Sequence, residues 1–242
     1  MNTDSLNNTP GRIQVIDLIR GVDIIFMVLF NYSVTLRYFG LIHIQPDLLY
    51  SVTPLVIASI FIFISGAAAY ASFKNNKENF GKKFMLRGAK LLIFAAFITL
   101  FTAIFVPDGT IYFGILHFFA VSSFLVPVMV KYNKLNPAAG ILIILSGFYL
   151  QTQQFSFPYL LWLGFMPENF STFDYFPLIP WLGVLMLGVY SGKNIIEKTW
   201  HVTFKSKVAK TFEFLGKNSL TIYLIHQPVL IFILMLMGLK LF

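Results

Sequence analysis

Charged and amide side chains interrupt the first apolar run of the chain, IDLIRGVDIIFMVLFNYS. It carries Asp17, Arg20 and Asp23, and Asn31 follows eight residues after the last of them. Spacings of three residues align the charges along one ridge of a helix. A charge in lipid is costly, so these groups should face protein or water and pair with one another. They predict either a self-neutralising cluster that orients the helix or the polar wall of a substrate tunnel.

Histidines are the candidates for proton transfer, because imidazole accepts a proton near neutral pH. His43 lies in RYFGLIHIQPDLLY, His117 in PDGTIYFGILHFFA, and His226 with Gln227 in NSLTIYLIHQPVLIF. We favour His117 and His43 as the base, because the proline after Gln227 loosens backbone that would hydrogen-bond His226. A lone histidine in a helix also suits a purely structural role, and one in a loop suits simple solvation.

Other polar residues complete the set of site candidates. Asp174 and Trp181, in FDYFPLIPW, should lie near the outer side of the membrane, at the level of Asn31. His201 should be a surface residue on the opposite, cytoplasmic side. The chain has no Cys, so neither a disulfide nor a thiolate nucleophile is available. The histidines lack close ligand spacings, and we expect no metal site.

The composition is that of an integral membrane protein. Of the 242 residues, 57% are hydrophobic and 12% are charged, and the mean hydropathy is +0.75. We expect an all-α polytopic bundle of about seven transmembrane helices. It should form one domain over residues 1–242, of which residues 1–12 are a polar N-terminal tail. A further apolar segment, FPYLLWLGF, is too short to span and should be re-entrant or interfacial. The predicted spans are 14–38, 49–73, 85–106, 110–131, 137–151, 175–192 and 214–239.

Basic residues are distributed unevenly over the predicted loops. Most of the 18 Lys and Arg fall in the N-terminal segment and alternate loops, whereas the opposite loops hold only Arg37 and Lys240. The positive-inside rule then predicts a plasma-membrane protein with a cytoplasmic N-terminus and an external C-terminus. The net charge of +8 reflects this asymmetry and contact with membrane lipid, so no nucleic-acid partner is expected.

Two further patterns concern helix packing and the membrane surface. TWHVTFKSKVAKTFEF mixes basic and apolar residues as an amphipathic helix at the headgroups does. SGAAAYAS and GVLMLGVYSG supply small residues that let helices approach closely.

Several sequence blocks occur in one order: RIQVIDLIRGVDIIFMVLFNYS, FIFISGAAAY, FGILHFFAVS, DYFPLIPWLGVLMLGVYSGK and FLGKNSLTIYLIHQPVL. Over residues 12–235 the chain thereby resembles the catalytic domain of the heparan-alpha-glucosaminide N-acetyltransferase family, in its short prokaryotic form. That family is similar to the wider transmembrane acyltransferases. The resemblance implies transfer of an acetyl or other acyl group from cytoplasmic acyl-CoA, such as acetyl-CoA, to an acceptor on the far side.

The resemblance also implies roles for individual residues. Asn31 matches an active-site Asn of the first span, and His43 is the nearest match to a His of the following loop. Many wider relatives place a His eleven residues after an Arg, whereas here Asn31 stands eleven residues after Arg20. The large extracytoplasmic domain of the heparan enzyme is absent, so heparan itself is not the expected substrate.

These inferences combine into a mechanism with two rivals. A histidine would be the base, Asn31 an oxyanion or acceptor-orienting donor, and basic residues a cradle for the CoA phosphates. The acceptor would be a hydroxyl or amine on an extracytoplasmic glycan or small molecule, and a homodimer is left open. The rivals are a transporter or proton-coupled carrier that uses the intramembrane Asp, Arg and His residues, and a purely structural membrane protein. The predicted cradle residues are Arg20, Lys82, Lys83, Arg87 and Lys90.

Overall fold

Helices dominate the structure, a computed structural model that describes residues 13–45, 47–199 and 201–237. The described residues contain no β-strand, only two isolated bridges. The predicted all-helical class is therefore confirmed. The helices are α1 (Gln14–Tyr38), α2 (Leu48–Asn75), α3 (Phe80–Phe105), α4 (Ile115–Lys131), α5 (Asn136–Leu150), α6 (Leu178–Thr199), α7 (Lys207–Lys217) and α8 (Ser219–Leu236).

The number of membrane spans is lower than the sequence led us to expect. Among the described residues, α2, α3, α6 and α8 are long and apolar enough to cross a membrane, which gives four spans. A fifth is reached if α4 and α5, which meet at a bend of 101°, form one broken span. Separately they have only 17 and 15 residues. The charged residues of α1 lower its hydropathy, so about seven spans is more than length and composition support.

The segment FPYLLWLGF forms no spanning helix. Its centre is the 3₁₀ turn η4 (Leu161–Leu163), and the flanking chain folds back on itself. The Phe155 N–H donates to the Met166 carbonyl at 3.0 Å, and the Glu168 N–H donates to the Phe155 carbonyl at 3.2 Å. The non-spanning conformation agrees with the prediction, whereas its position in the membrane stays a prediction.

The contacts divide the chain into two compact units. The first comprises the described residues of Ser65–Asn194, and the second those of Arg12–Ile64 and Ile195–Phe242. The boundaries fall within α2 and α6. That the two units form the single domain expected from the sequence stays a prediction.

Glycines let the helices of the first unit touch backbone to backbone. A Cβ added to Gly66 in α2 would lie 2.3 Å from the carbonyl oxygen of Leu185 in α6. A Cβ added to Gly183 in α6 would lie 2.4 Å from the carbonyl oxygen of Gly140 in α5. Both distances are far below van der Waals contact, so no larger residue fits without a shift of the helices. The predicted packing role of SGAAAYAS and GVLMLGVYSG is confirmed.

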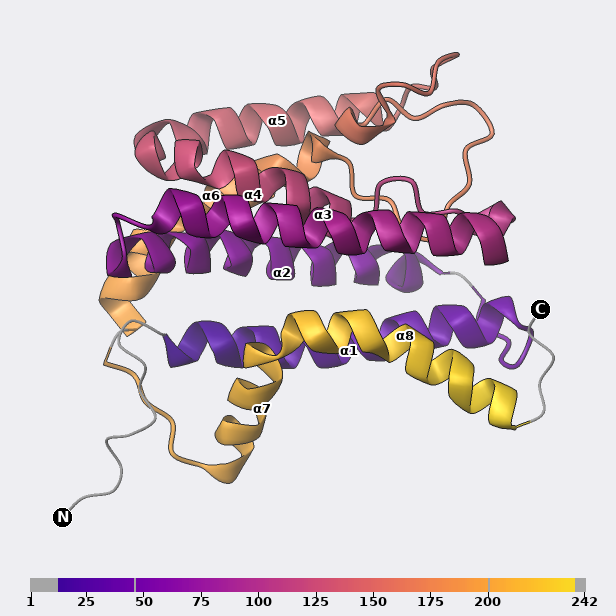
Figure 1. Ribbon diagram of the computed structural model, residues 1–242, viewed down its shortest axis with the longest axis horizontal. Helices are drawn as coiled ribbons and strands as arrows, with labels where there is room; N and C mark the ends of the chain where they lie inside the picture. Colours follow the sequence, from indigo (N-terminus) through magenta and orange to yellow (C-terminus); the bar gives the residue numbers. More distant parts are fainter. Residues whose placement is uncertain (1–12, 46, 200, 238–242) are drawn as a thin grey trace. The chain divides into compact units, whose positions relative to one another are not determined.

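The second unit is built on α1, which contacts both α7 and α8. Figure 1 shows α8 running alongside α1 and α7 projecting from them. Glycines again allow the closest contact, because a Cβ on Gly216 of α7 would lie 1.8 Å from the Asp17 carbonyl oxygen. A Cβ on Gly21 would lie equally close, at 1.8 Å, to the carbonyl oxygen of Phe212. The first half of α1 is thus fixed against α7 by direct backbone contact.

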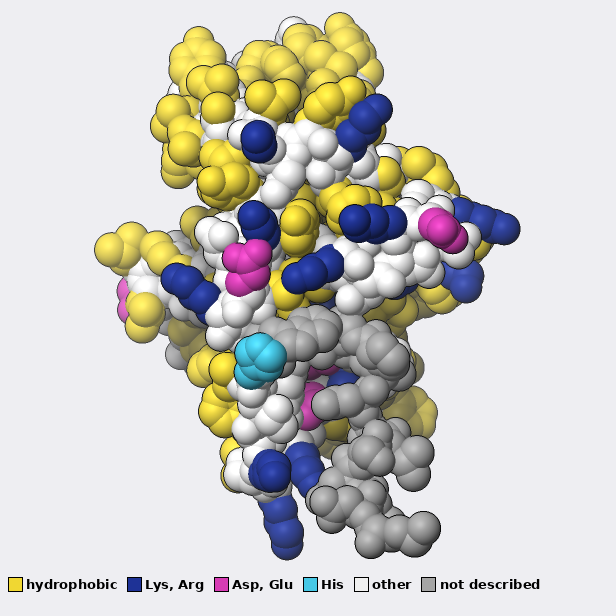
Figure 2. Space-filling view, turned by 90° about the vertical axis from the view of Figure 1, so that its left-hand side faces the viewer, with side chains coloured by type: hydrophobic (Ala, Val, Ile, Leu, Met, Phe, Trp, Pro, Cys, Tyr) yellow, Lys and Arg dark blue, Asp and Glu magenta, His cyan; other side chains and the backbone are white. Residues whose placement is uncertain are grey.

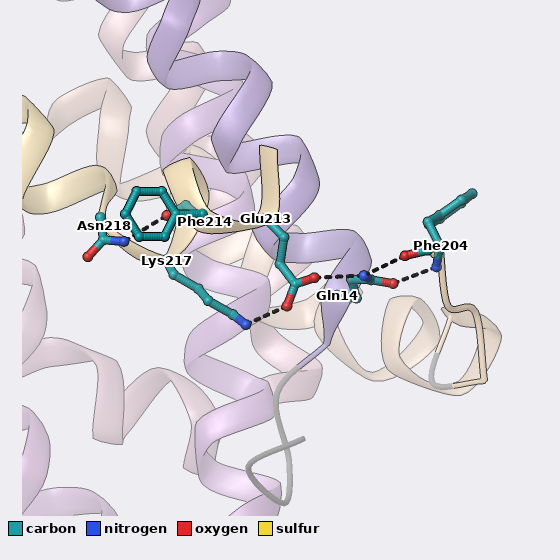
Figure 3. A network of polar contacts seen from close by, with 6 residues as sticks. All are labelled: Gln14, Phe204, Glu213, Phe214, Lys217 and Asn218. Atoms are coloured by element: carbon teal, nitrogen blue, oxygen red, sulfur yellow. Dashed lines mark hydrogen bonds and ion pairs between the residues drawn. The ribbon is translucent and has the colours of Figure 1, made fainter. Parts of the chain in front are cut away.

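A polar network holds the start of α1 to α7 and to the segment before it (Figure 3). The Phe204 N–H donates to Gln14 Oε1 at 2.7 Å, and Gln14 Nε2 donates to the Phe204 carbonyl at 3.0 Å. Gln14 Nε2 also donates to Glu213 Oε2 at 2.7 Å, and Lys217 bonds the other Glu213 oxygen. The predicted amphipathic segment therefore contains a helix, α7, while its place at the lipid headgroups stays a prediction.

Candidate active site

The second unit brings together a histidine and an amide from distant parts of the sequence. Asn31 lies in the second half of α1 and His226 in the middle of α8. Asn31 Nδ2 lies 3.3 Å from His226 Nε2, although 195 residues separate the two along the chain. His226 is only 8% exposed. Of the four histidines, His226 is the one whose ring contacts the predicted Asn31.

Hydrogen bonding defines which nitrogen of His226 carries the proton. His226 Nδ1 lies 2.6 Å from the Tyr223 carbonyl oxygen, which can only accept, so Nδ1 must be the donor. In a neutral imidazole Nε2 then has a free lone pair, and the Asn31 amide nitrogen donates to it. The same amide nitrogen donates to Met27 Sδ at 2.9 Å. The pair thus presents a neutral imidazole whose accepting nitrogen is aimed at a hydrogen-bond donor.

Further contacts between α1 and α8 hold this pair in place. Tyr32 Oη donates to the His226 carbonyl at 2.9 Å, and Gln227 Nε2 donates to Thr35 Oγ1 at 2.5 Å. The Oε1 atom of Gln227 is buried and has no hydrogen-bond partner among the described residues. It is a vacant acceptor on the residue that follows the histidine in α8, able to receive an N–H or O–H group. An oriented imidazole suits proton transfer from a bound nucleophile.

Sequence reasoning missed the residues that support the pair. Met27 and Thr35 flank Asn31 at intervals of four residues, so all three share one face of α1. Tyr32 bonds the backbone carbonyl of His226 instead of its ring. The four-residue spacing is a signal that the sequence contains, but it does not identify α8 as the helix that this face meets.

His117, favoured from the sequence as the base, uses both ring nitrogens to hold the start of α4. The Gly114 N–H donates to Nδ1 at 3.2 Å, so this nitrogen carries no proton. Nε2 therefore donates to Thr99 Oγ1 at 3.1 Å, and Thr99 donates to the Ile111 carbonyl at 2.6 Å. The lone pair of His117 is occupied by the cap of its own helix. This geometry favours a structural role.

Asp174 and Trp181 belong to the same first-unit framework. Asp174 Oδ2 accepts from the Ile115 N–H at 2.9 Å and so helps to cap α4. Trp181 is buried in α6, with its ring 5.0 Å from that of Phe176. Tyr175 Oη, next to Asp174 in sequence, donates to the Leu161 carbonyl at 2.9 Å.

His43 lies apart from the Asn31–His226 pair, in the loop after α1. It is exposed and lines an open hollow of about 340 Å³. The side chain of Arg37 lines the same hollow, a role that the sequence did not suggest. The base role predicted for His43 stays a prediction, because no hydrogen bond of its ring is defined.

The charges at the start of α1 lie inside protein, as expected for groups that lipid excludes. Asp17 is 3% exposed and Asp23 is 4% exposed, while Arg20 is half-buried. Oδ2 of Asp23 has no hydrogen-bond partner within the described part of the chain. Asp17 sits at the close contact with Gly216, so the charged ridge is next to α7.

The other predicted cradle residues lie on α3 in the first unit. Lys82, Lys83 and Lys90 are exposed, and Lys83 Nζ donates to Ser72 Oγ at 2.7 Å. Arg87 lies over the Phe84 ring at 5.6 Å and lines a small, mostly apolar hollow. Lys and Arg side chains outnumber carboxylates in the view of Figure 2. Binding of CoA phosphates by these residues stays a prediction.

Comparison with known proteins gives one finding. A family model described as "Heparan-alpha-glucosaminide N-acetyltransferase, catalytic" matches residues 12–228. Curated proteins give no match, and solved structures give none either. The matched range includes both Asn31 and His226.

Proposed function

Because the chain belongs to the heparan-alpha-glucosaminide N-acetyltransferase catalytic family, we propose that it is an acyl-CoA-dependent acyltransferase of the plasma membrane. It transfers an acetyl or other acyl group from cytoplasmic CoA to a hydroxyl or amine of a sugar or glycan outside. In this orientation the N-terminus is cytoplasmic and the C-terminus external. The observation that carries the proposal is the 3.3 Å contact between Asn31 Nδ2 and the unprotonated Nε2 of His226.

The proposed reaction begins when the acceptor takes the place of Asn31 at His226. Nε2 removes the proton from the acceptor O–H or N–H as its oxygen or nitrogen attacks the thioester carbonyl carbon. The carbonyl of Tyr223, bonded to Nδ1, stabilises the imidazolium that forms. Gln227 Oε1 receives a further N–H or O–H of the acceptor and orients it.

Asn31 then acts on the tetrahedral intermediate. Its amide, released from His226, donates to the oxyanion that develops on the former carbonyl oxygen. Collapse of the intermediate re-forms the carbonyl and breaks the carbon–sulfur bond. The departing CoA thiolate takes the proton from His226, which leaves acylated acceptor, CoA thiol and neutral imidazole.

Arg20 is proposed to bind a phosphate of CoA. It stands eleven residues before Asn31, which is about 16 Å along α1. The long pantetheine arm would run along α1 between these two points, past the buried Asp23. A guanidinium is well suited to the phosphate end because its fork of donors matches phosphate oxygens.

Acetyl-CoA should stabilise the purified protein. At about 100 times the dissociation constant, a ligand adds about 2.7 kcal/mol of stability, so we expect the Tm to rise by about 5 °C or more. Differential scanning fluorimetry in detergent measures this shift, with ATP as a control that has phosphates but no pantetheine arm. If the protein were only a transporter or only a structural membrane protein, acetyl-CoA should not shift its Tm. The absence of a shift at saturating acetyl-CoA would refute the proposal.

A further inference from the structure

The hollow beside His43 is built by the end of α1 and the loop that follows. Gly40 adopts a left-handed conformation, with φ of 71°, which ends α1 and turns the chain. The Gly40 N–H donates to the Arg37 carbonyl at 2.9 Å, and the Leu41 N–H donates to the Leu36 carbonyl at 2.8 Å. The turn therefore brings the following loop residues close to the end of α1. The lining residues are Arg37, Gly40, Ile42, His43, Ile44 and Gln45.

The polar groups of the hollow suit an anion. Arg37 supplies only donors, and its guanidinium is held over the Tyr50 ring at 5.8 Å. No lining residue is acidic. The nearest carboxylate in sequence, Asp47, accepts the Tyr50 N–H at 2.7 Å and so caps the start of α2. The hollow thus has a positive charge, further donor groups on His43 and Gln45, and no carboxylate lining.

The size and place of the hollow suit one part of an acceptor molecule. Its volume of about 340 Å³ lies in the range of small-molecule sites. Arg37 follows Asn31 by six residues, which is about 9 Å along α1. The two residues also lie about a third of a turn apart around the helix, so a ligand of one or two sugar units held at Arg37 must pass around α1 for another of its groups to reach His226.

We propose that this Arg37 hollow binds a carboxylate or phosphate group of the acceptor, while the nucleophilic group of the acceptor reacts at His226. The inference rests on the proposed function, to which it adds the class of acceptor. The anion is held by the guanidinium fork, which places a neutral sugar at a disadvantage. The anionic group belongs either to a soluble sugar acid or sugar phosphate, or to a lipid headgroup.

Binding of small probes tests the hollow without any acyl transfer. The full chain is placed in phosphatidylcholine nanodiscs and titrated with D-glucuronate, glucose 6-phosphate and D-glucose, with binding followed by saturation-transfer NMR. We expect both anions to bind about tenfold or more tightly than glucose, because hydrogen bonds to charged groups are the stronger ones. Arg37→Gln should abolish this preference, and Arg37→Lys should weaken it through loss of the fork.

Two controls make the result decisive. Lys210→Gln removes one positive charge from an exposed position of α7 and should leave the preference for anions over glucose intact. The acetyl-CoA shift in Tm should persist in Arg37→Gln, which shows that the variant is folded. Equal binding of glucuronate and glucose, or an unchanged preference in Arg37→Gln, would overturn the inference. If acetyl-CoA gives no shift in the parent protein while the anion preference holds, only the proposed acyl transfer falls.

Nanodiscs of phosphatidylglycerol separate the two sources of the anion. Competition that removes glucuronate binding there identifies the lipid headgroup as an occupant of the Arg37 hollow. Unchanged binding identifies a soluble ligand. Both results require the anion site, whereas a lack of anion preference in either lipid contradicts it.

Discussion

Replacing His226 by glutamine lowers acetyl transfer by about 100-fold or more, the usual scale for loss of a general base. Glutamine retains polar atoms near Asn31 and Tyr223 but has no lone-pair nitrogen that takes up a proton. Initial rates with radiolabelled acetyl-CoA measure the effect. The acetyl-CoA shift in Tm should be nearly unchanged, because the proposed mechanism places His226 at the reacting group and the CoA phosphates at Arg20.

A matched set of variants identifies the base. His201→Gln makes the same change at an exposed position and should leave turnover unaltered. His117→Gln should lower stability by about 1 kcal/mol through loss of its helix cap, with much smaller loss of turnover. If His117→Gln or His43→Gln abolishes turnover while His226→Gln remains active, the sequence-based choice is right and the Asn31–His226 assignment is wrong.

Replacing Asn31 by alanine lowers turnover by about 100-fold to 1,000-fold, as loss of an oxyanion donor does in other enzymes. The effect should fall on kcat, because the amide interacts most strongly with the charge that develops in the transition state. Steady-state kinetics with varied acetyl-CoA separates kcat from KM.

Ser33→Ala provides the control for Asn31 on the same helix. Ser33 donates to the Phe30 carbonyl within its own helix, at 2.6 Å, so its loss should not change kcat. An Asn31→Ala variant with normal kcat and a raised KM would show that Asn31 binds substrate without stabilising the transition state. Wild-type kinetics in Asn31→Ala would remove it from the site altogether.

Local sequence predicts much of the helical structure. The expected segment 14–38 coincides with α1, Gln14–Tyr38, because it contains no Pro and no pair of Gly residues before Gly40 turns the chain. The bounds of the last expected span, 214–239, agree less well with the helices of the structure. The chain breaks at Asn218, whose Nδ2 donates to the Phe214 carbonyl at 2.8 Å, so α7 ends there and α8 begins at Ser219.

The active-site geometry is harder to predict because it depends on contacts between distant segments. Periodicity places Asn31 on a face of α1, but it does not identify α8 as the helix packed against that face. His117 and His226 also look alike in sequence, since both lie in apolar helices. Only the bonds from Gly114 and to Thr99 distinguish the capping histidine from His226, whose accepting nitrogen faces the Asn31 side chain.

Acetyl transfer across a sealed membrane tests the central claim most directly. The protein is reconstituted in liposomes with glucosamine 6-phosphate and glucose 6-phosphate on both sides of the membrane, and radiolabelled acetyl-CoA is added outside, with His226→Gln as the background. The account predicts labelled acetyl sugar inside the liposomes, at a rate that falls about 100-fold or more in the variant. Label that reaches sugar only on the side of acetyl-CoA, or equal labelling by wild type and His226→Gln, would contradict it.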